Sequence, residues 1–235
     1  MDLQVSTPTV SEDVARRLRL LIHSGQLGPG DRLPPERDLA PLMCVGRVSL
    51  REAIRLLQAR GYVEVRRGAT GGTFVTQLDR PYEDWLGQMR SRVDEIGDII
   101  DMRIGLETRA AVLAARRRTD EHLAEMTEAI EQLDASENRV SFRTADARFH
   151  GALARAAQNR RLETAVVESR GEMFLPLDRL VFTAQIESCR AGHTAVYQAV
   201  RDRNGELAAR AMEAHLEQSR REMQQVIFGG PEPPP

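Results

Sequence analysis

The apolar residues follow a helical period along almost the whole chain, and the period changes to a two-residue alternation only near the N-terminus. Residues 62–65 alternate apolar and polar side chains, and residues 73–76 form a second short run with strand propensity. The stretch 66–72 between them holds three glycines, which is typical of a hairpin loop. The chain is therefore predicted to be mainly α-helical with a single β-hairpin.

Three helices are predicted before the hairpin. The first begins at Ser11 as N-cap and ends at Gly25; the second opens at Pro34-Pro35; the third spans residues 48–60, with Gly61 as its stop. Three helices followed by a hairpin predict a winged helix-turn-helix.

The expected domain order is a winged helix-turn-helix over residues 1–76, a linker over 77–81, an all-helical bundle over 82–228 and a disordered tail over 229–235. Within the bundle, six or seven helical segments are expected. Their boundaries are expected near Arg92, Arg118, Asn138, Asn159, Ser188 and Asn204.

Length and composition fit a folded cytoplasmic protein. The chain has 235 residues, of which 41% are hydrophobic, but no apolar stretch long enough to span a membrane and no signal-peptide pattern. Cys44 and Cys189 have no ligand-type or disulfide spacing, so each is interpreted as a reduced, partly buried residue. We expect no membrane partner.

The net charge of −2 conceals an uneven distribution. Residues 1–76 hold 11 Arg against 8 acidic residues, a balance of +3, whereas residues 77–235 hold 22 against 27, a balance of −5. This difference favours a polyanion-binding N-terminal domain, although charge alone does not exclude an ordinary variation in composition.

The third helix carries the residues expected to contact DNA. Arg47 and Arg51 are four residues apart and share a face, so each offers a guanidinium group to a guanine edge or a phosphate. Arg66 and Arg67 in the hairpin would reach the adjacent backbone or minor groove. A solvated helix face is the alternative for each arginine alone, but the order of elements favours double-stranded DNA as the partner.

Three motifs, in order and at characteristic spacing, resemble the GntR family of bacterial regulators. They are GPGDRLPPERDLA (residues 28–40), VGRVSLREAI (45–54) and GYV (61–63) with GTFV (72–75). The resemblance implies that the operator is contacted by Arg37, Arg47, Ser49, Arg51, Arg67 and Gly68. It also implies a homodimer on a short palindrome. Gly46 and Val48 depart from the family pattern, and each lacks a hydroxyl that would bind phosphate.

Polar residues on apolar helix faces are the informative feature of the C-terminal part. Asp146 and His150 share one helix face, while His193 and His215 each lie on an apolar stripe of a later helix. Three such helices could bring the four side chains to one cation, which would suit Zn²⁺, Ni²⁺, Mn²⁺ or Fe²⁺. A set of separate, hydrogen-bonded core residues is the alternative.

MRIGLE (102–107), DARFH (146–150), Asn159 and the two later histidines resemble the FCD ligand-binding domain of the FadR-like branch of the GntR family. The resemblance implies that Asp146, His150, His193 and His215 bind a divalent metal ion, with Zn²⁺ favoured, and it disfavours acyl-CoA as the ligand.

The expected function is a repressor-type regulator whose operator binding responds to a small carboxylate or hydroxy acid at the metal. Arg103 lies on an apolar stripe with Glu107 and is a candidate clamp for the acid; an Arg–Glu pair between helices is the alternative. A metal-dependent enzyme acting on a small carboxylate, a metal that is itself the signal and a purely structural metal are the competing functions. The DNA-binding domain argues against an enzyme.

Overall fold

The computed structural model describes residues 9–68, 71–91, 93–137, 139–172 and 182–228. These residues form ten helices and one two-stranded sheet, so the prediction of a mainly α-helical chain with one hairpin is confirmed. The elements are α1 (Val10–His23), α2 (Glu36–Leu42), α3 (Arg47–Ala59), β1 (Val63–Arg66), β2 (Gly72–Val75), α4 (Asp79–Ser91), α5 (Val93–Arg117), α6 (Asp120–Asp134), α7 (Arg139–Ala156), α8 (Arg160–Glu172), α9 (Phe182–Arg201) and α10 (Gly205–Phe228).

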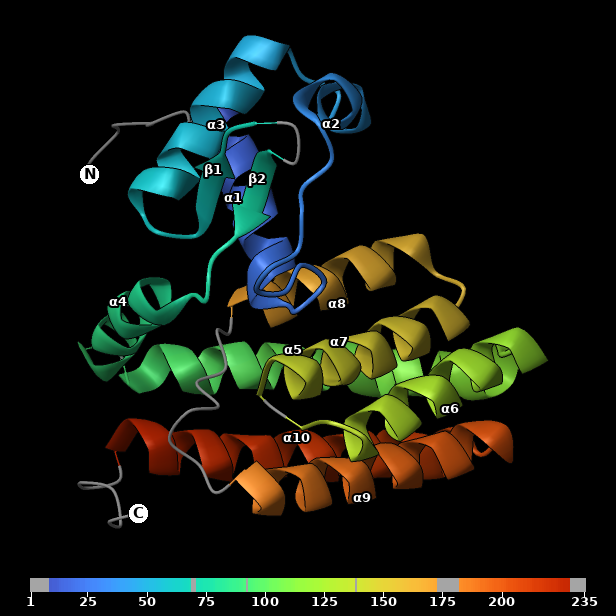
Figure 1. The fold of residues 1–235 in the computed structure, drawn as a ribbon. Helices are drawn as coiled ribbons and strands as arrows, with labels where there is room; N and C mark the ends of the chain where they lie inside the picture. The colour runs from blue at the N-terminus through green and yellow to red at the C-terminus, as the bar shows by residue number, and fades with distance from the viewer. Residues whose placement is uncertain (1–8, 69–70, 92, 138, 173–181, 229–235) are drawn as a thin grey trace, which may run out of the picture.

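The N-terminal elements form a winged helix-turn-helix, as predicted. Helix α1 packs against α3, and β1 pairs antiparallel with β2 in a register that runs from Val63–Val75 to Arg66–Gly72. The wing, α2 and α3 lie at the end of the molecule remote from α9 and α10 (Figure 1). Helix α3, which is expected to contact DNA, therefore lies away from the helical bundle.

The start of α1 differs from the prediction of Ser11 as N-cap. The N-cap is Thr9, whose hydroxyl accepts a hydrogen bond from the Glu12 backbone N–H at 3.2 Å. The Glu12 carboxylate accepts the Thr9 backbone N–H at 2.7 Å, which completes a capping box. Ser11 lacks a Glu or Gln three residues later, so Thr9 satisfies more of the free amides. At the other end, Gly25 has φ +79° and stops the helix as predicted.

Two predicted boundaries in the C-terminal part are wrong. Helix α4 begins at Asp79, so residues 79–81 of the predicted linker form its first turn, where Pro81 is tolerated because first-turn amides need no helical acceptor. The break expected near Ser188 lies inside the continuous helix α9. Breaks near Arg118, Asn159 and Asn204 are confirmed. Arg92, Asn138 and the tail 229–235 lie outside the described residues.

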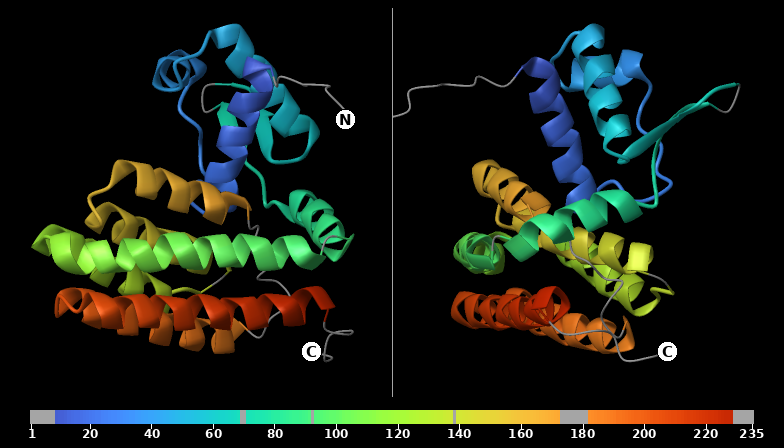
Figure 2. Two further views of the ribbon diagram at one scale, coloured as in Figure 1. Left: turned by 180° about the vertical axis from the view of Figure 1, so that it is seen from behind. Right: turned by 90° about the vertical axis from the view of Figure 1, so that its left-hand side faces the viewer.

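The C-terminal helices form a bundle in which the long helices α5 and α10 run side by side (Figure 2). Helix α9 packs on α10, and α6 packs on α7. Fully buried alanines, such as Ala111 on α5, Ala152 on α7 and Ala208 on α10, let the helices approach closely around a few larger side chains. Among the described helices, none has both the length and the apolar character that a membrane crossing requires.

The two domains share one apolar core at their junction. Leu18 and Ile22 of α1 belong to the same buried cluster as Trp85 of α4 and Ile99 of α5. His23 is also buried there, with Nδ1 2.9 Å from the Gly171 carbonyl oxygen and Nε2 2.9 Å from the Tyr62 hydroxyl. Burial, with Arg19 and Arg143 nearby, lowers the pKa of His23 from its ordinary 6.5 to about 3.

Acid should therefore weaken the fold at this junction. The neutral form of His23 stabilises the native state above pH 6.5, and this stabilisation should be lost as the pH falls from 6.5 toward 3. In His23→Gln, which keeps a donor and an acceptor but does not titrate, the urea midpoint should fall less between pH 7 and pH 4.5 than in the unsubstituted protein. Identical pH profiles for the two proteins would contradict this role.

Candidate metal centre and nucleic-acid interface

The four predicted metal ligands converge at the centre of the helical bundle. Asp146 and His150 come from α7, His193 from α9 and His215 from α10, and all four side chains are buried. One ligand atom from each residue lies within 4.8 Å of all the others. The side chains therefore meet at one point and are not separated in the core.

Three contacts within this cluster have the spacing of ligands around one ion, and all the ligand atoms lie within 4.8 Å of one another. The Asp146 Oδ1 atom is 3.5 Å from His150 Nε2 and 3.3 Å from His193 Nε2, and His150 Nε2 is 3.3 Å from His215 Nε2. Ligand atoms bound to Zn²⁺ at about 2.0–2.1 Å stand roughly 3.3 Å apart in a tetrahedron. The three nitrogens and one carboxylate oxygen therefore fit a first-row divalent ion.

A buried carboxylate fixes the orientation of His150. The His150 Nδ1–H donates a hydrogen bond to Glu107 on α5, so the lone pair of Nε2 is turned toward the cluster. Glu107 in turn accepts from Arg103, whose Nε and Nη2 are each 2.8 Å from Glu107 Oε1. Arg103 thus forms an ion pair with Glu107, one turn along its own helix.

Arg170 of α8 holds the second oxygen of the candidate ligand Asp146. Its Nη2 is 2.6 Å from Asp146 Oδ2, and both side chains are buried. Burial alone would raise the pKa of Asp146, but the Arg170 guanidinium opposes burial and the pKa lies well below its ordinary value. Asp146 is therefore ionised, and its Oδ1 atom faces the cluster.

Two histidines of the cluster are held in the neutral form. Burial, opposed by the Asp146 carboxylate, lowers the pKa of His193 to about 4. Burial and the neighbouring histidines lower the pKa of His215 well below its ordinary value. The His193 ring also stacks on Phe149 with a centroid distance of 3.9 Å. Neutral, fixed imidazoles present the lone pairs that a metal requires.

Gly192 makes the position of His215 possible. A Cβ atom at this residue of α9 would lie 2.5 Å from Nδ1 and 2.9 Å from Cγ of His215, closer than real Cβ atoms approach any neighbour. The His215 ring therefore lies directly against the backbone of α9. Sequence reasoning missed Gly192, since a glycine within a helix carries no signal for a contact with a distant histidine.

The Cys189 thiol lies beside the cluster, with Sγ 3.5 Å from both Asp146 Oδ1 and His193 Nε2. Burial and the Asp146 carboxylate raise the pKa of Cys189 well above its ordinary value, so the thiol is protonated without a metal. Its predicted burial is confirmed. The same expectation is wrong for Cys44, which is exposed.

The predicted DNA-contacting residues lie on the free end of the winged helix. Arg47, the first residue of α3, is exposed, and Val48 beside it is 84% exposed. Ser49 is half-buried. Gly46 is the N-cap of α3 and offers no side-chain hydrogen bond, so the first-turn amides remain available to a phosphate oxygen.

Arg51 is held by a carboxylate that the sequence analysis did not single out. Its Nε and Nη2 lie 3.2 and 2.9 Å from Oε2 of Glu36, the first residue of α2. Nη1 takes no part in this pair, so the outer edge of the guanidinium is available to a guanine. Arg37, on α2, is exposed and lies 3.3 Å from Asp38.

The wing presents Arg67 and Gly68 as exposed residues directly after β1. Gly68 has φ +107°, a conformation that favours glycine, which explains the residue at this bend. Arg66 donates to Glu64 at 2.5 Å and lies over the Phe74 ring at 4.4 Å, so its guanidinium is held against the wing. Arg67 is therefore the better candidate for a phosphate contact.

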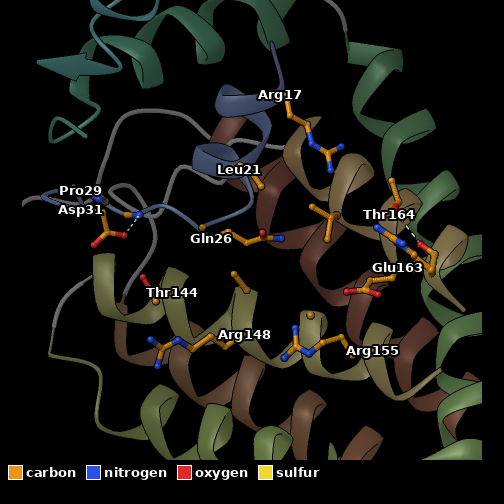
Figure 3. Close-up of a pocket in the computed structure, with 16 residues that line it drawn as sticks. Arg17, Leu21, Gln26, Pro29, Asp31, Thr144, Arg148, Arg155, Glu163 and Thr164 are labelled. Carbon is orange, nitrogen blue, oxygen red and sulfur yellow. Dashed lines mark hydrogen bonds between the residues drawn. The ribbon is translucent and has the colours of Figure 1, made fainter. Parts of the chain in front are cut away.

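A hollow of about 580 Å³ separates part of the DNA-binding domain from α7 and α8 (Figure 3). Arg17 and Arg155 on its walls pair with Glu168 and Glu125 at 2.8 and 2.6 Å. The hollow shows that the two domains touch over only part of their facing surfaces.

The arrangement is that of a DNA-binding regulator with a polar site inside its second domain, and comparison with known proteins agrees. Residues 10–75 match the GntR family of bacterial regulatory proteins, and residues 98–218 match the FCD domain. The chain therefore belongs to the GntR family, with an FCD domain as its ligand-binding domain.

Three curated relatives are named as regulators. The putative HTH-type transcriptional regulator RmpR of Mycobacterium gastri is 33% identical over 92% of this chain and 80% of its own length. LutR of Bacillus subtilis is 30% identical over 83% and 93%. The putative L-lactate dehydrogenase operon regulatory protein of Escherichia coli is 33% identical over 88% and 83%. The assignment to transcription regulators instead of enzymes is thus confirmed.

The fold is shared with solved structures. Escherichia coli McbR/YncC superposes with a TM-score of 0.57 at 19% identity, covering 94% of this chain and 99% of that one. A putative GntR regulator from Rhodococcus sp. RHA1 gives 0.52 at 22% identity, covering 92% and 98%.

Substitution of Gly192 should disturb the cluster without unfolding the protein. In Gly192→Ala, the added methyl group displaces the His215 ring, so zinc affinity measured by chelator competition should fall at least tenfold. Gly105→Ala on α5 is the matched control, because a Cβ there meets nothing within 4 Å. Equal zinc affinity in the two variants would contradict the positioning role.

Proposed function

We propose that the protein is a transcription repressor whose operator binding is weakened by a small carboxylate or hydroxy acid bound at a divalent metal ion. The observation that carries the proposal is the meeting of Asp146, His150, His193 and His215 at one buried point in a chain whose other domain is a winged helix.

The metal would be held by one carboxylate oxygen and three imidazole nitrogens, with Zn²⁺ favoured over Ni²⁺, Mn²⁺ and Fe²⁺. When bound, such an ion supplies coordination positions that an anionic oxygen can take. Glu107 and Arg170 would keep His150 and Asp146 in place.

An organic acid is supported by the charges around the cluster. Arg103 and Arg170 are both buried nearby, and a guanidinium group can bind a carboxylate through two parallel hydrogen bonds. We retain Arg103 as the clamp, with Glu107 holding its Nε and Nη2. The name of the Escherichia coli relative, which refers to an L-lactate dehydrogenase operon, favours a hydroxy acid as the first ligand to test.

On the DNA side, the proposed operator contacts are Arg37, Arg47, Ser49, Arg51, Arg67 and Gly68. Arg47 and Arg51 would read bases in the major groove, while Ser49 and Arg67 would bind phosphates. Val48 projects beside Arg47 and would contact a thymine methyl group. A homodimer would place two such heads on a short palindrome.

Substitutions in the recognition helix test the DNA assignment. Arg51→Ala should weaken binding to an operator selected from random duplex DNA by about 1–3 kcal/mol. Glu36→Gln should relax the preference at the same base pair, since the carboxylate no longer holds Arg51. Arg67→Ala should weaken binding to all DNA sequences alike and reduce the dependence of that binding on salt concentration. Arg210→Ala on α10 is the control, and an Arg51→Ala variant that matches it would refute the contact.

The metal assignment is tested by elemental analysis. The purified protein should hold about one divalent ion per chain and His193→Ala should lose most of it, because a ligand is removed from a preformed site. His122→Ala removes a histidine of α6 outside the cluster and should keep the metal. Full metal content in His193→Ala would remove the basis for the site.

Calorimetric titration of the zinc-loaded protein with L-lactate, glycolate and acetate tests the ligand class, with lactamide as the neutral control. At least one acid should bind, lactamide should not, and the acid should lower operator affinity about fivefold or more. If no acid binds, the acid-sensing function is refuted, and a metal that is structural or is itself the signal remains.

A further inference from the structure

The last turn of α8 contacts both the metal cluster and the DNA-binding domain through two consecutive residues. The Arg170 side chain reaches into the bundle, where its Nη2 lies 2.6 Å from Asp146 Oδ2. The Gly171 carbonyl oxygen faces the other way and lies 2.9 Å from Nδ1 of His23 at the end of α1. Arg170, which pairs with the candidate ligand Asp146, is therefore the direct neighbour in the chain of Gly171, which contacts the winged helix.

The approach of α8 to α1 at this turn is as close as backbones allow. A Cβ atom on Gly171 would lie 2.8 Å from the carbonyl oxygen and 2.8 Å from Cδ2 of Leu20. A side chain at residue 171 would push the two helices apart, so the contact requires glycine. Such a tight contact passes a displacement of α8 on to α1 because residue 171 has no side chain that could absorb it.

His23 extends this contact to the wing. A carbonyl oxygen only accepts hydrogen bonds, so Nδ1 of the buried, neutral His23 donates to Gly171. Nε2 then carries the lone pair and accepts from the Tyr62 hydroxyl at 2.9 Å. Tyr62 follows α3 and precedes β1. Its hydroxyl therefore links the contact between Gly171 and His23 to the helix and the wing that are proposed to bind DNA.

Two hollows flank the contact between Gly171 and His23. A hollow of about 580 Å³ lies on the α7 side of α1 (Figure 3), and a second one of about 580 Å³ lies on the α4 side and is lined by His23, Tyr62 and Gly171 themselves. Trp85 of α4, the single tryptophan of the chain, donates from Nε1 to the Glu172 carbonyl oxygen at 3.3 Å. Space on either side leaves the two domains room to reorient about this turn.

We propose that residues 170–171 of α8 couple the metal site to the winged helix, by passing a shift of Asp146 through Arg170 and Gly171 to His23 and Tyr62. The proposal rests on the proposed function, because it takes Asp146 as a metal ligand. A buried ion pair is too costly to break, so a shift of the carboxylate carries Arg170 with it.

Zinc alone is the probe, added to the full-length, chelator-stripped protein. Zinc binding, Trp85 emission and the affinity for a selected operator are measured together. In the unsubstituted protein, zinc should change the emission at one ion per chain and change operator affinity about fivefold or more, and operator should change zinc affinity by the same factor.

Tyr62→Phe removes one hydroxyl and should keep zinc affinity and the emission change, while the zinc effect on operator affinity falls below twofold. Gly171→Ala should also lose the operator response. Tyr197→Phe on α9 and Gly105→Ala on α5 are the matched controls and should respond fully.

A zinc-binding protein whose operator affinity ignores zinc would overturn the coupling and leave the metal site standing. A full operator response in both Tyr62→Phe and Gly171→Ala would overturn it as well. Absence of zinc binding would instead refute the proposed function, and the coupling with it.

Discussion

The fold of the C-terminal domain depends on completing a buried network of charges. Arg103, Glu107, His150, Asp146 and Arg170 form a chain of contacts within a core otherwise made of alanines and aliphatic residues. Removing one member of a buried ion pair costs about 3–5 kcal/mol, because the partner is left charged and without water. The five side chains therefore stabilise the fold only when all of them are present.

This requirement also arranges the helices. The network draws on α5, α7 and α8, and His193 and His215 extend it to α9 and α10. Because imidazole and carboxylate groups are short, all five helices must come close to one point. Buried alanines and Gly192 supply the small side chains that such an approach needs. The same residues that would bind a ligand therefore specify how the bundle packs.

The sequence revealed those parts of the site that follow from the helical period. His193 and His215 could be placed inward because each lies on an apolar stripe of its own helix. Arg170 and Gly192 could not be found, since their roles arise only when α8 meets α7 and α9 meets α10. Local competition explains the smaller error at α1, where Thr9 displaced the predicted cap through a capping box. The spacing of residues along each helix therefore locates the candidate ligands but not the residues that hold them in place.

Two paired arginines, Arg51 in the DNA-binding domain and Arg170 in the helical bundle, differ in what can release them. The Arg51–Glu36 pair is exposed, and such pairs contribute only about 0–1 kcal/mol, so DNA can compete for the guanidinium at little cost. The Arg170–Asp146 pair is buried, and water cannot replace either partner. A change at the cluster therefore moves this pair as a unit instead of breaking it. Movement as a unit shifts the backbone of α8, and the backbone at Gly171 is what the winged helix contacts.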